Sequence, residues 1–225
     1  MGSLTLYSPS YSETVNVLVG EEKEHFTVHR RLISQNSDLF RTACSKRWRN
    51  DEDEGVSLPY EEPCDFQVYL DWVYAQRQQP PSFFIKPRKH ADGRYHRRAE
   101  RLCALWVVGD YVLDRAFKNV VMDELLADPS PRKHLMARDA IVDVIVGTNA
   151  DCTLRKWLVE HLTVYATPED LDALREHMDS DLAFTVVRKF AETRNKKSYD
   201  IYDHTLRCAS YHEHDDDEPV CGTLR

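Results

Sequence analysis

The chain has 225 residues, with 30 Lys and Arg against 38 Asp and Glu, and a formal net charge of -8 at pH 7. Hydrophobic residues make up 42% of it, which is enough for a packed core and excludes wholesale disorder. The acidic balance argues against a dedicated DNA- or membrane-binding protein, because such proteins carry net positive charge or a large basic face.

Several enzyme and secretion signatures are missing from the sequence. The seven glycines stand apart, so neither a phosphate-binding loop nor a dinucleotide fingerprint can be built from them. No G-x-S-x-G, H-E-x-x-H or C-x-x-C motif occurs, and no long apolar run could span a membrane. We therefore expect a non-enzymatic protein of the cytoplasm or nucleus, without catalytic residues, cofactor, bound metal or disulfides.

The N-terminal part begins with a β pattern. Residues 1–11 predict an irregular lead-in, and the alternation of Val15, Val17 and Val19 predicts a strand over 14–19. A charged turn at Gly20 leads to a second strand over 25–28, so the two strands form a predicted hairpin. Two short helices follow, the second of which begins at Ser37, and a short strand is expected over 56–59.

From Pro63 onward the pattern is helical. Proline suits the first turn of a helix, and this helix ends before the polar and basic insert at 76–98. Two more helices are expected over 97–114 and 115–127. Residues 129–195 predict an all-helical extension, within which Thr167 starts a helix with a capping box. Residues 196–225 predict an acidic, disordered tail.

The order of these elements, and the residues within them, resemble the BTB/POZ domain family over residues 12–128. The matching segments are Val15-x-Val17-x-Val19-Gly20, Phe26-x-Val28-His29-Arg30-x-Leu32-Ile33, Ser37-x-Leu39-Phe40-Arg41, Val56-x-Leu58-Pro59, Phe66-x-x-Tyr69-Leu70-x-Trp72-Val73-Tyr74 and Leu105-Trp106-Val107-Val108-Gly109-Asp110-Tyr111. The long insert and the helical C-terminal part are similar to fungal members of that family.

The resemblance implies an α+β fold, in which a helical cluster packs on a small mixed sheet, followed here by the all-helical extension. It also implies that the protein binds other proteins. Many members of the family form homodimers, and many are substrate adaptors that dock on the Cullin-3 scaffold of a ubiquitin ligase. The expected partners are therefore Cullin-3 or a second copy of the chain, without a membrane.

Two positions depart from the family pattern. Thr14 stands where many members carry an aspartate, which belongs to a charged pocket at the dimer face of transcription-factor members. In the loop before the short strand, Cullin-3 binders often carry a hydrophobic residue, any residue and then Glu. The matching residues are Trp48, Arg49 and Asn50, followed by Asp51, so the hydrophobe is present and the glutamate is not.

Trp48, Arg49, Asn50 and Asp51 are the candidate partner-binding residues. A tryptophan in a charged loop is a candidate interface anchor, because exposed aromatic residues are enriched at binding hot spots. The alternative is that Trp48 folds back onto its own domain.

A second hypothesis is a nucleic-acid- or chromatin-associated regulator that uses the basic residues of segment 86–101. Phosphate contacts would make its retention on DNA salt-dependent, and charge reversal at Arg97, Arg98 and Arg101 would abolish it. The competing interpretation, a solvated insert balanced by acidic segments, is favoured by the net acidity of the chain.

The histidines offer weaker signals. His29 belongs to the family pattern and is expected to be a hydrogen-bonded fold residue. His161 is expected to be half-buried with its hydrogen bonds satisfied. His212 and His214 could hold a metal weakly with nearby acids, although a tract of this composition usually binds nothing specific.

Overall fold

The computed structural model describes residues 13–45, 55–75, 77–86, 97–128, 135–194 and 207–214. The N-terminal elements are β1 (Thr14–Val19), β2 (Glu24–His29), α1 (Arg30–Ile33), α2 (Asp38–Ala43), β3 (Val56–Leu58), α3 (Pro63–Tyr74) and the short 3-10 helix η2 (Pro81–Phe84). The C-terminal elements are α4 (Arg98–Tyr111), α5 (Arg115–Ala127), α6 (Arg138–Gly147), α7 (Thr153–Tyr165), α8 (Pro168–Leu174), α9 (Ser180–Thr193) and α10 (Arg207–Tyr211).

The strands form one small mixed sheet in the order β2-β1-β3. β1 pairs antiparallel with β2, which places Val17 opposite Phe26, and parallel with β3, which places Val17 opposite Val56. Gly20 has a φ of 79°, a conformation that favours glycine, and it turns the chain out of β1. The predicted hairpin and the predicted short strand are therefore both confirmed.

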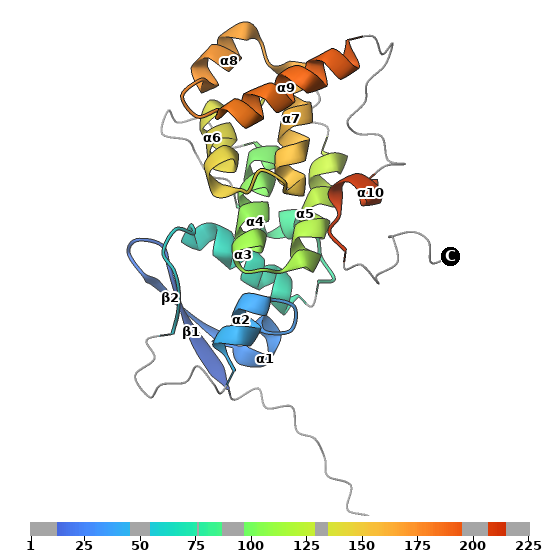
Figure 1. Cartoon of the computed structure of the whole chain (residues 1–225). Coiled ribbons are helices and arrows are strands. Elements are labelled where there is room, and N and C mark those ends of the chain that lie inside the picture. Colours follow the sequence, from blue (N-terminus) through green and yellow to red (C-terminus); the bar gives the residue numbers. More distant parts are fainter. Residues whose placement is uncertain are drawn as a thin grey trace, which may run out of the picture.

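Helix α3 lies between the sheet and the central helices (Figure 1) and is buried on almost every side. Phe66 contacts Phe26 of β2 edge to face, with ring centroids 5.2 Å apart. At the next turn Tyr69 packs on Phe117 of α5, at 5.0 Å. Tyr69 also donates a hydrogen bond to Asp114, whose other oxygen accepts the backbone N–H of Phe117 and caps α5. One aromatic row thus joins the sheet to α5.

The backbones of α4 and α5 approach closely at Gly109. A methyl group at this position would lie 2.9 Å from the Phe117 ring and 3.0 Å from Cγ of Lys118. Glycine is required here by space rather than by backbone conformation. The helices are joined by a tight turn in which Ser37, the N-cap of α2, donates to the carbonyl of Val112.

The C-terminal helices α6 to α9 stack beyond α4 (Figure 1), without a break in the core. The buried apolar side chains form one cluster that runs from β1 through α9 to Tyr211. The Arg155 side chain of α7 is buried, and its guanidinium donates to the carbonyls of Ile145 and Thr148 at the end of α6. It thus fastens α7 to α6. The fold is the predicted one, a mixed sheet with helices followed by an all-helical part.

The tail differs from its prediction over residues 207–214. Residues 207–214, called the C-terminal strap below, consist of α10 and the three residues after it. The strap lies along α5 and α7 (Figure 1), rather than forming a disordered chain. Tyr211 is 4% exposed and its hydroxyl donates to Glu160 of α7. The hydrophobic periodicity of the sequence does not predict such a segment, because one aromatic residue and several polar contacts hold it in place.

None of the helices in the described parts of the chain combines the length and the hydrophobicity that a membrane-spanning helix needs.

Candidate protein interaction site

A groove of about 590 Å³ opens between the start of α3, the outer face of α4, and α6. Residues from distant parts of the chain line it, among them Tyr60, Glu61, Asp65, Arg101, Tyr111 and Val146. Tyr60 and Glu61 enter it because the chain turns directly after β3, before α3 begins at Pro63. The groove is thus built jointly by the sheet end of the molecule and by the C-terminal helices.

Acidic side chains dominate the electrostatics of this groove. Asp65 and Arg101 form an ion pair whose side chains are 3% and 5% exposed. Burial, with the neighbouring carboxylates of Asp65 and Glu62, raises the pKa of Glu61 to about 7.

Glu100 fixes the floor of the groove. One oxygen of its carboxylate accepts the backbone N–H of Arg97 at 2.8 Å, at the start of α4. The other accepts the backbone N–H of Ala137 at 2.9 Å, just before α6. Because Glu100 is 4% exposed, this buried bridge sets the spacing between α4 and α6.

Apolar side chains stand exposed on the rim of the groove. Tyr60 is 87% exposed, Val146 is 76% exposed and Tyr111 is 39% exposed. Exposed aromatic side chains such as Tyr60 and Tyr111 are of a type that is enriched at protein-binding surfaces. Tyr60, Tyr111 and Val146 were not candidates from the sequence, because no local pattern indicates that residues so far apart in the chain lie together.

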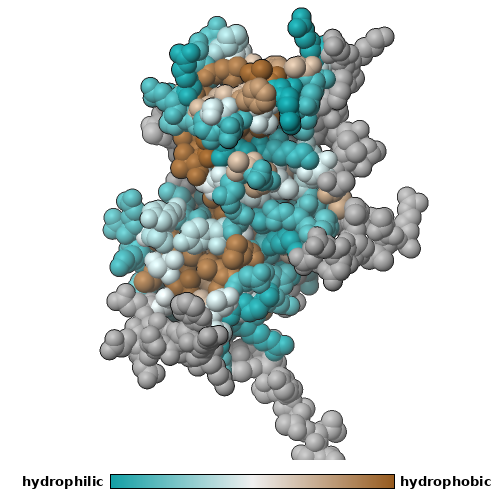
Figure 2. Space-filling view, in the orientation of Figure 1, coloured by the Kyte–Doolittle hydropathy of each residue, from teal (hydrophilic) through white to brown (hydrophobic). Residues whose placement is uncertain are grey.

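A second exposed apolar surface lies on α9. Phe184 is 69% exposed and Val187 is 62% exposed. Figure 2 shows hydrophobic colour over the α6 and α9 end of the molecule, and again lower on the same face where α3 meets the sheet. The exposed apolar surface is therefore not confined to the groove.

The predicted partner-binding residues Trp48, Arg49, Asn50 and Asp51 lie outside the described residues. The described ends of their loop are Ser45, after α2, and Gly55, before β3. Since β3 is three residues long and Tyr60 follows it closely, the loop and the groove are adjacent along the chain. The role of Trp48 and its three neighbours in partner binding therefore stays a prediction.

A small charged cavity lies near the start of β1, where Thr14 is paired with His29. It measures about 310 Å³, and Glu13, Arg30, Arg31 and Arg41 are among its lining residues. Glu13 and Arg30 form an ion pair at 3.1 Å. An acid thus does lie beside this cavity, one residue before the threonine that departs from the family pattern.

The described arginines of the basic segment 86–101 bind protein groups. Arg97 donates to the carbonyl of Leu135, Arg98 pairs with Glu124 at 2.9 Å, and the buried Arg101 pairs with Asp65 at the groove. Three cations that the nucleic-acid hypothesis requires are thus engaged within the fold.

The histidines behave differently from one another. His29 is hydrogen-bonded, as predicted. Its ring nitrogen Nδ1 lies 2.8 Å from the Tyr74 hydroxyl, and the same hydroxyl accepts a hydrogen bond from the His29 backbone N–H. His161 does not match the prediction of a half-buried, satisfied residue. It is fully buried, stacks on Trp157, and neither ring nitrogen has a hydrogen-bond partner among the described residues. Burial lowers its pKa to about 4.

The comparisons with known proteins agree with the fold. The family model of the BTB/POZ domain matches residues 9–91, which include the whole sheet, α1 to α3 and η2. Among curated proteins no relative matches the chain. The matched segment begins close to the predicted start at residue 12 and ends before α4, whereas the resemblance seen in the sequence extends to 128. Residues 9–91 of this chain are a BTB/POZ domain.

Proposed function

We propose that this chain is an adaptor that docks on Cullin-3 through the loop at 46–54 and the groove between α3, α4 and α6. BTB/POZ domains are generally protein-protein interaction modules and are typically non-catalytic. An adaptor of this kind acts in the cytoplasm or the nucleus. The observation that carries the proposal is the groove with Tyr60, Tyr111 and Val146 on its rim.

The chemistry of the groove describes the partner surface that fits it. Glu61 and Glu62 line the groove, whereas its Asp110 is paired with Lys118 at 2.9 Å and its Arg101 is paired with Asp65. The complementary surface therefore carries basic groups around an apolar centre, which receives the rim side chains. Trp48, with Arg49, Asn50 and Asp51, supplies a further anchor from the adjacent loop.

The C-terminal helices contribute one wall of this groove, since Asp143 and Val146 of α6 line it. In an adaptor they extend the scaffold contact. The apolar residues Phe184 and Val187 of α9 lie on another element and leave a surface on which a client protein can bind.

A second candidate function, a homodimerising regulator, is favoured by the charged cavity at the start of β1. Glu13 and Arg30 supply opposite charges there, so a dimer face with a charged pocket does not depend on Thr14. Sedimentation of the full-length chain tests this candidate. A dimer that dissociates in Glu13→Arg supports it, and a monomer at every concentration contradicts it.

The nucleic-acid alternative has less support, because Arg97, Arg98 and Arg101 are bound to protein groups. Their reversal would disturb the fold whether or not nucleic acid binds.

Calorimetric titration of the full-length chain with the N-terminal domain of Cullin-3 tests the adaptor function. We expect micromolar or tighter binding, and a loss of about tenfold or more in Trp48→Ala and in Tyr60→Ala, as for an interface hot spot. Phe184→Ala is the matched control, since Phe184 is also exposed but lies on α9. A wild-type chain that gives no heat and no complex contradicts the proposal.

A further inference from the structure

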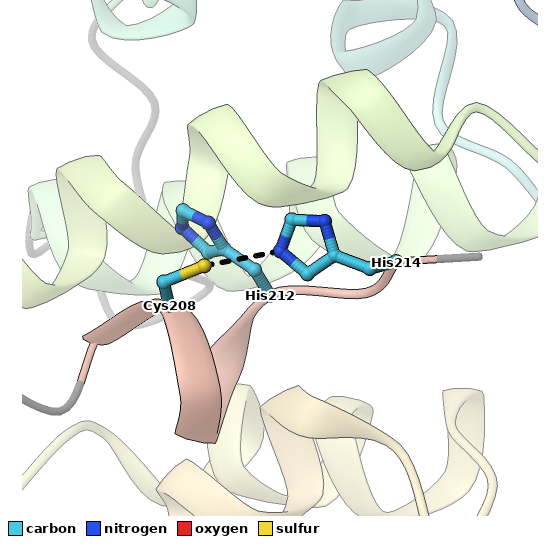
Figure 3. Close-up of side chains that lie close together, drawn as sticks. All are labelled: Cys208, His212 and His214. Atoms are coloured by element: carbon cyan, nitrogen blue, oxygen red, sulfur yellow. Dashed lines mark hydrogen bonds between the residues drawn. The ribbon is translucent and has the colours of Figure 1, made fainter. Parts of the chain in front are cut away.

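Three side chains with metal-binding chemistry meet in the C-terminal strap. Cys208 comes from α10, and His212 and His214 follow it directly. Their potential ligand atoms all lie within 4.8 Å of one another. The sulfur of Cys208 is 3.1 Å from Nε2 of His214, and in Figure 3 a dashed line joins the two, with the His212 ring beside the sulfur. Two imidazoles and one thiol therefore lie in one cluster.

His212 is held in a form that suits a metal ligand. Its side chain is 6% exposed, and its Nε2 lies 2.9 Å from Oδ1 of Asp123 on α5. Its other nitrogen, Nδ1, is buried without a hydrogen-bond partner among the described residues. A buried unsatisfied ring nitrogen is costly, and a metal ion would satisfy it. The carboxylate on the opposite nitrogen is the usual second partner of a metal-binding histidine.

The strap that carries these residues is anchored independently of any metal. The side-chain amide of Asn119 donates to the carbonyl of Glu213 and accepts its backbone N–H, each at 2.9 Å. Lys118 of α5 reaches the Glu213 carboxylate at 2.5 Å. Glu213 lies between the two histidines, so these contacts fix the positions from which both rings project.

We propose that Cys208, His212 and His214 bind one Zn²⁺ ion. Thiolate sulfur and imidazole nitrogen are the ligands that zinc selects, at about 2.3 and 2.0 Å. Nitrogen and sulfur ligand atoms of a tetrahedral zinc lie roughly 3.3–3.5 Å apart given those bond lengths, and the ligand atoms here lie within 4.8 Å of one another. Nδ1 of His212 is the ligand atom, because Nε2 is bound to Asp123. Binding releases the Cys208 thiol proton to solvent, and water completes the coordination.

The consequence is a link between the C-terminal strap and α5. Through His212 the ion would be tied to Asp123, and through Cys208 to α10, which packs on α5 and α7. Zinc therefore stabilises the docked strap over the released one, because the released strap does not hold the three ligands together.

Titration of the reduced, metal-free full-length chain with Co²⁺ and then Zn²⁺ tests the site. We expect one equivalent of Co²⁺ with a near-ultraviolet sulfur-to-cobalt charge-transfer band, displaced by one equivalent of Zn²⁺. Cys208→Ser abolishes the band, and His214→Gln weakens binding by at least about tenfold. Asp123→Asn weakens it about tenfold through the loss of the histidine's carboxylate partner. Cys64→Ser, at an exposed thiol outside the site, is the matched control and leaves the titration unchanged.

Amide hydrogen exchange gives a second readout, in which Zn²⁺ slows exchange over residues 208–214 of the wild type and not of Cys208→Ser. The proposal is overturned if no stoichiometric Co²⁺ binding occurs, or if the band and affinity survive unchanged in Cys208→Ser. Neither result depends on Cullin-3 binding.

Discussion

At the scale of single residues, two buried titratable side chains give opposite pH dependences. Glu61 has a raised pKa of about 7, so the folded chain holds a proton that the unfolded chain has lost between about pH 4.5 and 7. His161 has a lowered pKa of about 4, so between about pH 4 and 6.5 the unfolded chain holds the additional proton. The stability that Glu61 loses as pH rises is offset by what His161 gains over most of this range.

Glu61→Gln is expected to remove the loss of folding stability that the wild type shows as pH rises. The raised pKa means that stability present at low pH falls as pH increases toward 7, and glutamine stays neutral throughout. The variant should match the wild type near pH 4.5 and exceed it at pH 8 by on the order of 2 to 3 kcal/mol. Urea unfolding across pH measures this difference, and Glu24→Gln, at an exposed acid, is the control. Equal stabilities at pH 8 contradict the buried environment of Glu61.

His161→Leu is expected to show the opposite pH dependence, with its stability relative to the wild type increasing as pH falls. Because the pKa of His161 is lowered, wild-type stability is lost as pH falls below 6.5, and leucine has no proton to gain. The variant should be at least as stable as the wild type at pH 7, since two unsatisfied nitrogens are removed. At pH 4.5 its advantage grows to on the order of 2 to 3 kcal/mol. His25→Leu, at an exposed position, should show no such growth. If His161→Leu shows none either, the pKa of His161 is not lowered by burial.

At the scale of elements, the sequence predicts what local chemistry determines. Ser37 and Thr167 begin helices because their side-chain oxygens cap free N–H groups, and Pro63 begins α3, as predicted. The groove could not be predicted, because its walls come from residues 60–62, α4 and α6. The strap at 207–214 was missed since Asn119 and Tyr211 hold it through contacts that leave no periodic pattern.

The close approach of α4 and α5 predicts the effect of Gly109→Ala. A methyl group there meets the rigid, fully buried ring of Phe117 at 2.9 Å, so the helices must separate. We expect destabilisation of about 1–3 kcal/mol by chemical unfolding, the usual cost of overpacking. Gly147→Ala, whose added methyl meets the side chain of Val107 at 3.2 Å, should cost less. A Gly109→Ala variant as stable as the wild type would contradict this packing.

At the scale of the whole molecule, the BTB/POZ domain and the helices beyond it share one core. Cys103 of α4 is 1% exposed and lies 3.8 Å, sulfur to sulfur, from Met136 before α6. The packing is therefore continuous across the domain boundary that the sequence predicts at 128. The predicted boundaries at 128 and 195 stay predictions, and so does a fungal origin.

A shared core predicts one cooperative unfolding unit. Leu158 is fully buried in α7, and Leu158→Ala should cost about 2–5 kcal/mol through the cavity it leaves. In urea, exchange measured by peptide should then accelerate in β1 and α3 as well as in α7. Val187→Ala, at an exposed apolar position, is the control. If α3 keeps its wild-type protection while α7 loses its own, the two parts unfold separately.

We propose that the groove and the loop at 46–54 form a Cullin-3 docking surface. Amide hydrogen exchange of the full-length chain, with and without saturating Cullin-3 N-terminal domain, tests it most directly. We expect slower exchange over residues 46–62 and along the groove-lining turns of α4 and α6, with α9 unchanged. No change in any peptide, or protection confined to α9, would contradict it.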